Sequence, residues 1–243
     1  MRNLKKLLAV IVTVCILASM TIPAFAAASD AEICAALGVL KGDGAGVTDA
    51  YLAKATERYQ AAILYLRLIG KEEEAKAFTG EDNFEDANLI YAGGQRILAY
   101  LKANPDLGWA GVGGNKFEPT NAASAQMIYK VLLEALGYKQ DVDFKWAETL
   151  EFAAGVGLSK IADVTELTNN DVAIAIVEAL KANVKDSDKT LAEKLVEDGI
   201  IDEAVAAQYG LIELAPEKLE VVSVTADNLK EVVVAFNKAL NSD

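Results

Sequence analysis

Apolar side chains recur every three to four residues along most of the chain between residues 31 and 210. This spacing places them on one face of an α-helix, and the same stretches are rich in the helix formers alanine, leucine, glutamate and lysine. Only four prolines occur, and none interrupts such a stretch. We therefore predict a mainly α-helical region. Its main helices are expected within residues 53–68, 89–101, 125–136, 146–156, 172–180 and 191–200.

Glycine-rich segments follow a helix at three similar places, residues 38–46, 107–115 and 155–159. Glycine adopts the left-handed backbone that ends one helix and redirects the chain. The sequence therefore predicts three units of helix, glycine-rich loop and helix. They are expected at residues 27–80, 81–140 and 141–212, with polar linkers at residues 71–74, 81–83 and 140–141. One such unit has too little core to fold alone, so the three should pack as one body.

A short phrase marks the start of the second helix in each unit. It reads Thr-Glu-Arg-Tyr-Gln at residues 56–60, Ala-Ser-Ala-Gln-Met at 123–127 and Leu-Thr-Asn-Asn-Asp at 167–171. The first two copies keep the same distance to Gly70 and Gly137. The third position changes from Arg58 to Ala125 to Asn169, so the architecture repeats while the chemistry does not.

After Pro216 the pattern changes to runs of β-branched residues, at 219–225 and 232–236. Such runs predict two strands, joined by residues 226–231 into a β-hairpin. Two strands alone are marginally stable. Residues 217–243 are therefore expected either to begin a truncated β-sandwich module or to pack against the helices.

The N-terminal residues predict export. Arg2, Lys5 and Lys6 precede an apolar run over residues 7–17, and residues 24–26 (Ala-Phe-Ala) fit a cleavage site. The run is short for a membrane span of about 20 residues. We expect residues 1–26 to be a cleaved signal peptide, and the mature protein to be secreted without membrane contact.

Charge and residue usage exclude several classes of function. Removing the signal peptide, with three basic and no acidic residues, takes the net charge from −13 to −16. No basic run exists, which argues against nucleic acid and anionic lipid as partners. The chain contains no histidine, which excludes a histidine-based triad or zinc site. Since no nucleotide-binding or nucleophile motif appears either, we expect no enzyme and no cofactor.

Two further features favour structural interpretations. Cys34 lies on the apolar face of a helix, where a buried core thiol is expected, with an intermolecular disulfide as the alternative. Residues 42–44 and 141–143 carry aspartates that suggest calcium. Neither segment continues into a loop with the closing glutamate of an EF-hand, so turns without a metal are expected.

These features together resemble a known family. Residues 55–70, from Ala-Thr-Glu-Arg to Leu-Ile-Gly, resemble the S-layer homology domain in the form found in clostridial surface proteins. Residues 84–86 (Phe-Glu-Asp) resemble the Phe-x-Asp opening of a repeat in that family. Residues 219–240 similarly resemble the first hairpin of the bacterial Ig-like modules that often follow such repeats.

The resemblance implies a fold and a partner. Three such repeats pack as a pseudo-threefold bundle, and the grooves between them bind secondary cell-wall polysaccharide, often pyruvylated. The protein is thereby held non-covalently on the Gram-positive wall or in its surface layer. The binding motif of the family, Ile-Thr-Arg-Ala-Glu, corresponds to the recurring phrase. A helix N-terminus and an arginine fork both suit the carboxylate of such a glycan.

Only the first copy keeps the arginine, which makes Arg58 the leading candidate. In the third copy Asp171 would repel an anion. The candidate glycan-binding residues are Arg58, Glu57, Gln60, Tyr59, Ser124, Thr168 and Trp109.

Structural alternatives stay open for these residues. The second and third copies would then only cap helices. Arg58 would be a surface arginine, either solvated or paired with an acidic residue such as Glu57 or Glu32. Trp109 would close one end of the bundle instead of stacking on a sugar. The alternative function is a structural S-layer assembly protein whose repeats pack against other subunits.

Overall fold

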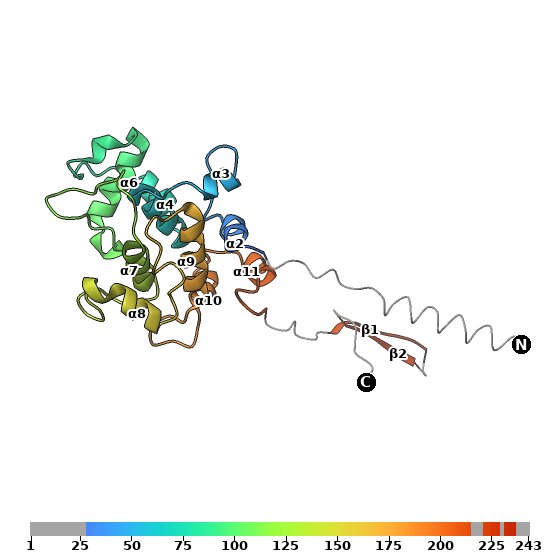
Figure 1. The fold of residues 1–243 in the computed structure, drawn as a ribbon. Coiled ribbons are helices and arrows are strands. Elements are labelled where there is room, and N and C mark those ends of the chain that lie inside the picture. Colours follow the sequence, from blue (N-terminus) through green and yellow to red (C-terminus); the bar gives the residue numbers. More distant parts are fainter. Residues whose placement is uncertain (1–27, 215–220, 229–230, 237–243) are drawn as a thin grey trace, which may run out of the picture.

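The computed structural model describes residues 28–214, 221–228 and 231–236. The prediction of a mainly helical protein is confirmed (Figure 1). None of the helices in these ranges is long and apolar enough to cross a membrane. The expected signal peptide lies outside the described residues.

Each of the three units expected from the sequence contains a group of consecutive helices. The first group is α2 (Asp30–Ala36), α3 (Asp49–Leu52), α4 (Arg58–Leu68) and α5 (Glu72–Lys76). The second is η1 (Ala87–Leu89), α6 (Ala92–Ala103), η2 (Pro105–Leu107) and α7 (Ala125–Ala135). The third is η3 (Trp146–Glu148), α8 (Thr149–Gly155), α9 (Asn169–Lys181), α10 (Leu191–Glu197) and α11 (Glu203–Gln208).

One of the expected linkers is helical. Residues 71–74 were expected to be a loop, but they lead into α5, which begins at Glu72. Glutamates at three successive positions of its first turn favour the positive end of the helix dipole. Glu72 is also buried and forms salt bridges with Lys41, Arg67 and Lys76. These contacts hold a helix that is too short to show an apolar period.

The start of α4 also differs from the prediction. Residues 53–57 were expected to be helical, but α4 begins only at Arg58. The Thr56 N–H donates to the carbonyl of Leu167 at 2.8 Å, and the Thr56 carbonyl accepts from the Ala123 N–H at 2.8 Å. Hydrogen bonds to other parts of the chain replace the helical ones, so tertiary contacts override the local pattern.

These hydrogen bonds bring the three copies of the recurring phrase together. Short bridges join Ala55 to Thr168 and Glu57 to Ala122. The helices that follow, α4, α7 and α9, begin at the third position of each copy. The starts of the three helices are therefore fixed to one another through their preceding segments.

Helices α4, α7 and α9 form the middle of the helical body (Figure 1). Nine of the 11 residues of α4 are buried, which is typical of a helix surrounded by protein. α7 packs against both α4 and α9, and α2 packs against α9. Cys34 of α2 is fully buried, and its thiol donates to the carbonyl of Ala173 at 3.6 Å. Burial raises the pKa of this thiol, and the prediction of a core thiol is confirmed.

Strands β1 (Val221–Asn228) and β2 (Glu231–Phe236) pair antiparallel, with Val224 opposite Val234. The register shifts between Val221 and Ser223 and again before Asn228. Residues 229–230, which would form the turn, lie outside the described ranges.

Candidate functional site

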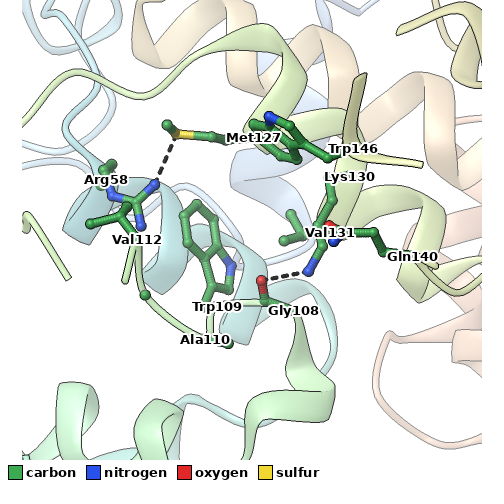
Figure 2. Close-up of a pocket in the computed structure, with 11 residues that line it drawn as sticks. Arg58, Gly108, Trp109, Ala110, Val112, Met127, Lys130, Val131, Gln140 and Trp146 are labelled. Carbon is green, nitrogen blue, oxygen red and sulfur yellow. Dashed lines mark hydrogen bonds between the residues drawn. The ribbon is translucent and has the colours of Figure 1, made fainter. Parts of the chain in front are cut away.

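A cavity of about 480 Å³ lies between the start of α4, the loop after η2, and α7 (Figure 2). Both tryptophans of the protein line it. The lining residues are Arg58, Gly108, Trp109, Ala110, Gly111, Val112, Met127, Lys130, Val131, Gln140 and Trp146. Two residues named from the sequence, Arg58 and Trp109, thus meet in one pocket, which we call the Arg58 pocket.

Arg58 is the first residue of α4 and is only 4 % exposed. Its Nε donates to the carbonyl oxygen of Phe117 at 2.8 Å, and its Nη1 donates to Sδ of Met127 at 3.0 Å. The second of these bonds is visible in Figure 2. A thioether is a weak acceptor, so Met127 satisfies the guanidinium poorly.

Aromatic rings surround the same guanidinium. Its carbon Cζ lies 5.0 Å from the ring centroid of Phe117 and 5.6 Å from that of Trp109. Such cation–π contacts favour the charged form and orient its plane. Trp109 is buried, and its indole N–H has no hydrogen-bond partner among the described residues. Trp109 is therefore a buried residue that also lines the pocket.

Arg58 forms no salt bridge with any described residue. The alternative of a surface arginine, solvated or paired with Glu57 or Glu32, is therefore wrong, because the side chain is buried. Burial lowers the pKa of Arg58, and the carboxylates of Glu118 and Asp86 act in the opposite direction. Buried charges in proteins are normally paired or fully hydrogen-bonded, so this cation lacks its usual partner.

A second cation lines the pocket. Lys130 of α7 donates from Nζ to the carbonyl of Gly108 at 2.7 Å and pairs with Glu134 at 2.9 Å. Among the described residues that line the pocket two are cationic and none is acidic, although the whole chain has a net charge of −13. The side chains that line the pocket therefore carry positive charge, while Glu134 pairs with Lys130 and the carboxylates of Glu118 and Asp86 act on Arg58 from outside the lining.

Asp86 holds the loop that presents the Phe117 carbonyl to Arg58. Its carboxylate accepts from the backbone N–H groups of Phe117 at 2.9 Å and Glu118 at 2.8 Å. Asp86 belongs to the Phe-Glu-Asp segment at residues 84–86 that stood out in the sequence. It does not line the pocket, but it positions a group that orients Arg58.

The pocket loop also depends on glycine at position 111. Gly111 has φ +89°, and a Cβ there would lie 2.6 Å from the carbonyl oxygen of Lys116 and 2.8 Å from Phe84. Both the backbone conformation and the space exclude a side chain. Within the glycine-rich segment 107–115, close packing therefore requires glycine at position 111.

The neighbours of Arg58 in the first copy point elsewhere. Glu57 is exposed and makes no side-chain cap to α4. The Tyr59 hydroxyl donates to the Tyr91 hydroxyl at 3.1 Å, and Gln60 Nε2 donates to the Tyr51 hydroxyl at 3.1 Å. The structure does not place Glu57, Tyr59 or Gln60 among the residues that line the Arg58 pocket.

The candidates in the other two copies serve as helix caps. Ser124 Oγ accepts from the Met127 N–H at 3.3 Å at the start of α7. Thr168 caps α9, where its Oγ1 accepts from the Asp171 N–H at 3.3 Å and donates to the Asp171 carboxylate at 2.6 Å. Neither side chain lines the pocket. Both match the capping alternative.

Asn169 takes the position of Arg58 in the third copy, and it is buried. Its Oδ1 accepts from the Thr56 hydroxyl at 2.9 Å, and its Nδ2 donates to the Tyr51 carbonyl at 3.0 Å. This amide joins the first and third copies and does not line the Arg58 pocket.

Of the eleven lining residues the sequence named only Arg58 and Trp109 as site candidates, and it missed Met127, Lys130, Gln140 and Trp146 among the others. Trp146 is 42 % exposed and lies across the pocket from Arg58 (Figure 2). Its one available signal was that it is one of only two tryptophans in 243 residues. The other three come close to Arg58 only through the packing of α7 and the loop after it.

Residues 28–214 and the two strands contain no group of three or more acidic or cysteine side chains that could hold a metal ion. Comparisons of the sequence with protein-family models and with curated proteins find no match. The Arg58 pocket is therefore the feature of the molecule that bears on its function.

Proposed function

We propose that this protein is an exported cell-surface protein that binds secondary cell-wall polysaccharide, with an acidic sugar unit held in the Arg58 pocket. The observation that carries the proposal is the buried guanidinium of Arg58, which lacks a carboxylate partner among the described residues. A ligand anion would supply that partner. The protein would thereby be held non-covalently on a Gram-positive wall.

The chemistry of the pocket supports an acidic sugar over other anions. Nη2 of Arg58 makes no hydrogen bond to any described residue, so one edge of the fork is available to a carboxylate. The exposed ring of Trp146 offers an apolar face on which a sugar can stack. The volume of about 480 Å³ lies within the range of roughly 300 to 1,000 Å³ that is usual for small-ligand sites.

We further propose that the three helical units form a pseudo-threefold bundle of the S-layer homology type. Its support is that α4, α7 and α9 begin at the same position of the recurring phrase and that their preceding segments are hydrogen-bonded together. Ala125 and Asn169 replace Arg58 in the other copies. The proposal therefore gives one glycan site per chain, with residues 217–243 as the start of an Ig-like module.

Co-sedimentation with cell-wall sacculi tests this function. The mature protein should pellet with native sacculi and stay in solution when the walls have been stripped of their secondary polymer. Arg58→Ala should release it from native sacculi, because the ligand loses a charge-assisted bidentate contact. Arg96→Ala is the matched control, since Arg96 is exposed on α6 away from the pocket.

Circular dichroism of each variant separates lost binding from lost folding. A folded Arg58→Ala protein that pellets as well as the wild type would remove Arg58 as the anchor. Equal binding to native and stripped sacculi would place the ligand in the peptidoglycan instead of the secondary polymer.

A second candidate function is structural assembly of a surface layer through protein–protein packing. It is favoured by two large apolar side chains close together before α6, Leu89 at 59 % and Tyr91 at 66 % exposed. If this surface holds subunits together, light scattering should show a mass that rises with concentration, and Leu89→Ser with Tyr91→Ser should abolish the rise. A strictly monomeric protein that still binds walls would exclude this function.

A further inference from the structure

We propose that Met127 is a site of oxidation by hydrogen peroxide, and that its sulfoxide closes the Arg58 pocket to anions. The oxidation site stands on the geometry of the pocket alone. Its effect on wall binding rests on the proposed function.

Met127 lies in the first turn of α7, where the Ser124 cap accepts from its backbone N–H. Its side chain is half-buried and lines the pocket, so a small oxidant that enters the pocket reaches the sulfur. The same sulfur lies 3.0 Å from Nη1 of Arg58 (Figure 2). Met127 is thus both accessible and in direct contact with the cation that the ligand needs.

The other sulfur atoms of the chain do not compete for the oxidant. Of the three methionines and two cysteines, Met1, Cys15 and Met20 fall within the predicted signal peptide. Cys34 is fully buried, which leaves its thiol protonated and out of contact with solvent. Oxidation of the mature chain at sulfur should therefore concentrate at Met127.

The reaction is a transfer of one oxygen atom. A lone pair of the thioether attacks one oxygen of hydrogen peroxide, so an S–O bond forms while the O–O bond breaks. The sulfur loses two electrons and the peroxide gains them. The departing hydroxide takes the proton of the transferred oxygen and leaves as water, and the product is methionine sulfoxide.

The sulfoxide oxygen changes what Arg58 can bind. It is a strong acceptor attached to a sulfur that the guanidinium already contacts, so it can accept the N–H that the thioether bound weakly. A ligand anion must then displace this new hydrogen bond. Because hydrogen bonds to charged groups are strong, we expect anion affinity to fall about tenfold or more.

The experiment compares the mature protein before and after treatment with hydrogen peroxide. Peptide mass spectrometry should find one added oxygen, at Met127. Quenching of tryptophan fluorescence then reports on the pocket, because both tryptophans line it. Iodide, an anion, should quench less after oxidation, while the neutral quencher acrylamide should quench equally. Sacculus binding should fall in parallel.

Two variants sharpen the result. Met127→Leu keeps the volume of the side chain and removes the sulfur, so peroxide should leave its iodide quenching and sacculus binding unchanged. Met127→Gln places a polar acceptor near Arg58 and should resemble the oxidised protein without any treatment. If oxidation lowers the stability of the fold, Met127→Gln still shows whether a polar acceptor beside Arg58 reduces quenching by iodide.

Two results would overturn the inference. The first is that Met127 stays unmodified under conditions that fully oxidise free methionine. The second is that iodide quenches the oxidised protein and the Met127→Gln protein as strongly as it quenches the untreated wild type. Failure of the untreated protein to bind sacculi would instead overturn the proposed function. In that case the ratio of iodide to acrylamide quenching still decides whether the sulfoxide closes the pocket.

Discussion

Arg58 and Glu72 are both buried charged residues, and their surroundings give them different roles. The Glu72 carboxylate pairs with Lys41 at 2.6 Å, Arg67 at 2.9 Å and Lys76 at 3.1 Å. Arg58 has a peptide carbonyl, a thioether and two aromatic rings. Glu72 is therefore a structural ion, whereas Arg58 has no carboxylate within salt-bridge distance among the described residues.

The ion pairs of Glu72 predict a pH dependence of stability. Burial acts to raise the pKa of Glu72, but bonds from Lys41, Lys76 and Arg67 outweigh it and lower the pKa from 4.5 to about 2. Because the pKa of Glu72 is lower in the folded state than in the unfolded state, the ionised carboxylate contributes its full stabilisation at pH values above 4.5. This contribution is lost as the pH falls from 4.5 towards 2. After discounting for solvent screening we expect about 1 to 2 kcal/mol.

Urea unfolding across that pH range measures this contribution, with Glu72→Gln as the comparison. The wild type should lose more stability on acidification than the variant, because the amide does not titrate. Identical pH profiles for the two proteins would contradict the role given to Glu72.

Asn169 carries a second prediction at the residue scale. Asn169→Ala leaves the Tyr51 carbonyl and the Thr56 hydroxyl without their partner, so the free energy of unfolding should fall by about 1 to 3 kcal/mol. Asn169→Asp keeps the acceptor for Thr56 but not the donor for Tyr51, and should also destabilise. Wall binding by the folded fraction should stay unchanged, since Asn169 does not line the pocket. Urea unfolding and sacculus binding measure the two effects, and lost binding in a folded Asn169 variant would contradict this assignment.

At the scale of elements, periodicity in the sequence predicted the longer helices to within a few residues. It failed at residues 53–57, where hydrogen bonds to residues 123 and 167 replace helical ones, and at α5, which is too short to show a period. The recurring phrase and its family resemblance, and not periodicity, singled out Arg58, and the glycine-rich loop singled out Trp109; both residues line the pocket. Periodicity could not find Lys130 or Trp146, because only the packing of α7 and the following loop brings them there.

The cap of α9 gives a prediction at this scale. Thr168→Ala removes the acceptor of the Asp171 N–H and should lower the free energy of unfolding by about 1 kcal/mol. Thr168→Ser keeps the hydroxyl and should retain most of the wild-type free energy of unfolding. Denaturant unfolding checks both changes. Sacculus binding should be the same in both variants, and a loss of binding in folded Thr168→Ala would instead return Thr168 to the ligand site.

On the scale of the whole molecule, a cationic pocket lies in a strongly acidic chain. An anionic wall polymer should be repelled at long range by the net charge of −16 expected for the mature chain and attracted only inside the Arg58 pocket. Salt screens charges beyond about 8 Å at physiological ionic strength and affects buried contacts much less.

Raising the sodium chloride concentration should therefore leave the fraction bound to sacculi unchanged or increase it. Co-sedimentation over a series of salt concentrations measures this dependence. A steep loss of binding with salt would show that exposed charges, and not the buried Arg58, hold the polymer.

The central claim is that Arg58 holds an acidic unit of the wall glycan, and titration with the secondary polymer released from the wall tests it most directly. Tryptophan fluorescence is the signal, because Trp109 and Trp146 both line the pocket. The wild type should show a saturable change, and Arg58→Lys, which keeps the charge but loses the planar fork, should bind at least about tenfold more weakly. The claim would be contradicted if both proteins showed the same saturable change in fluorescence. It would also be contradicted if the wild type showed no change although it still pellets with sacculi.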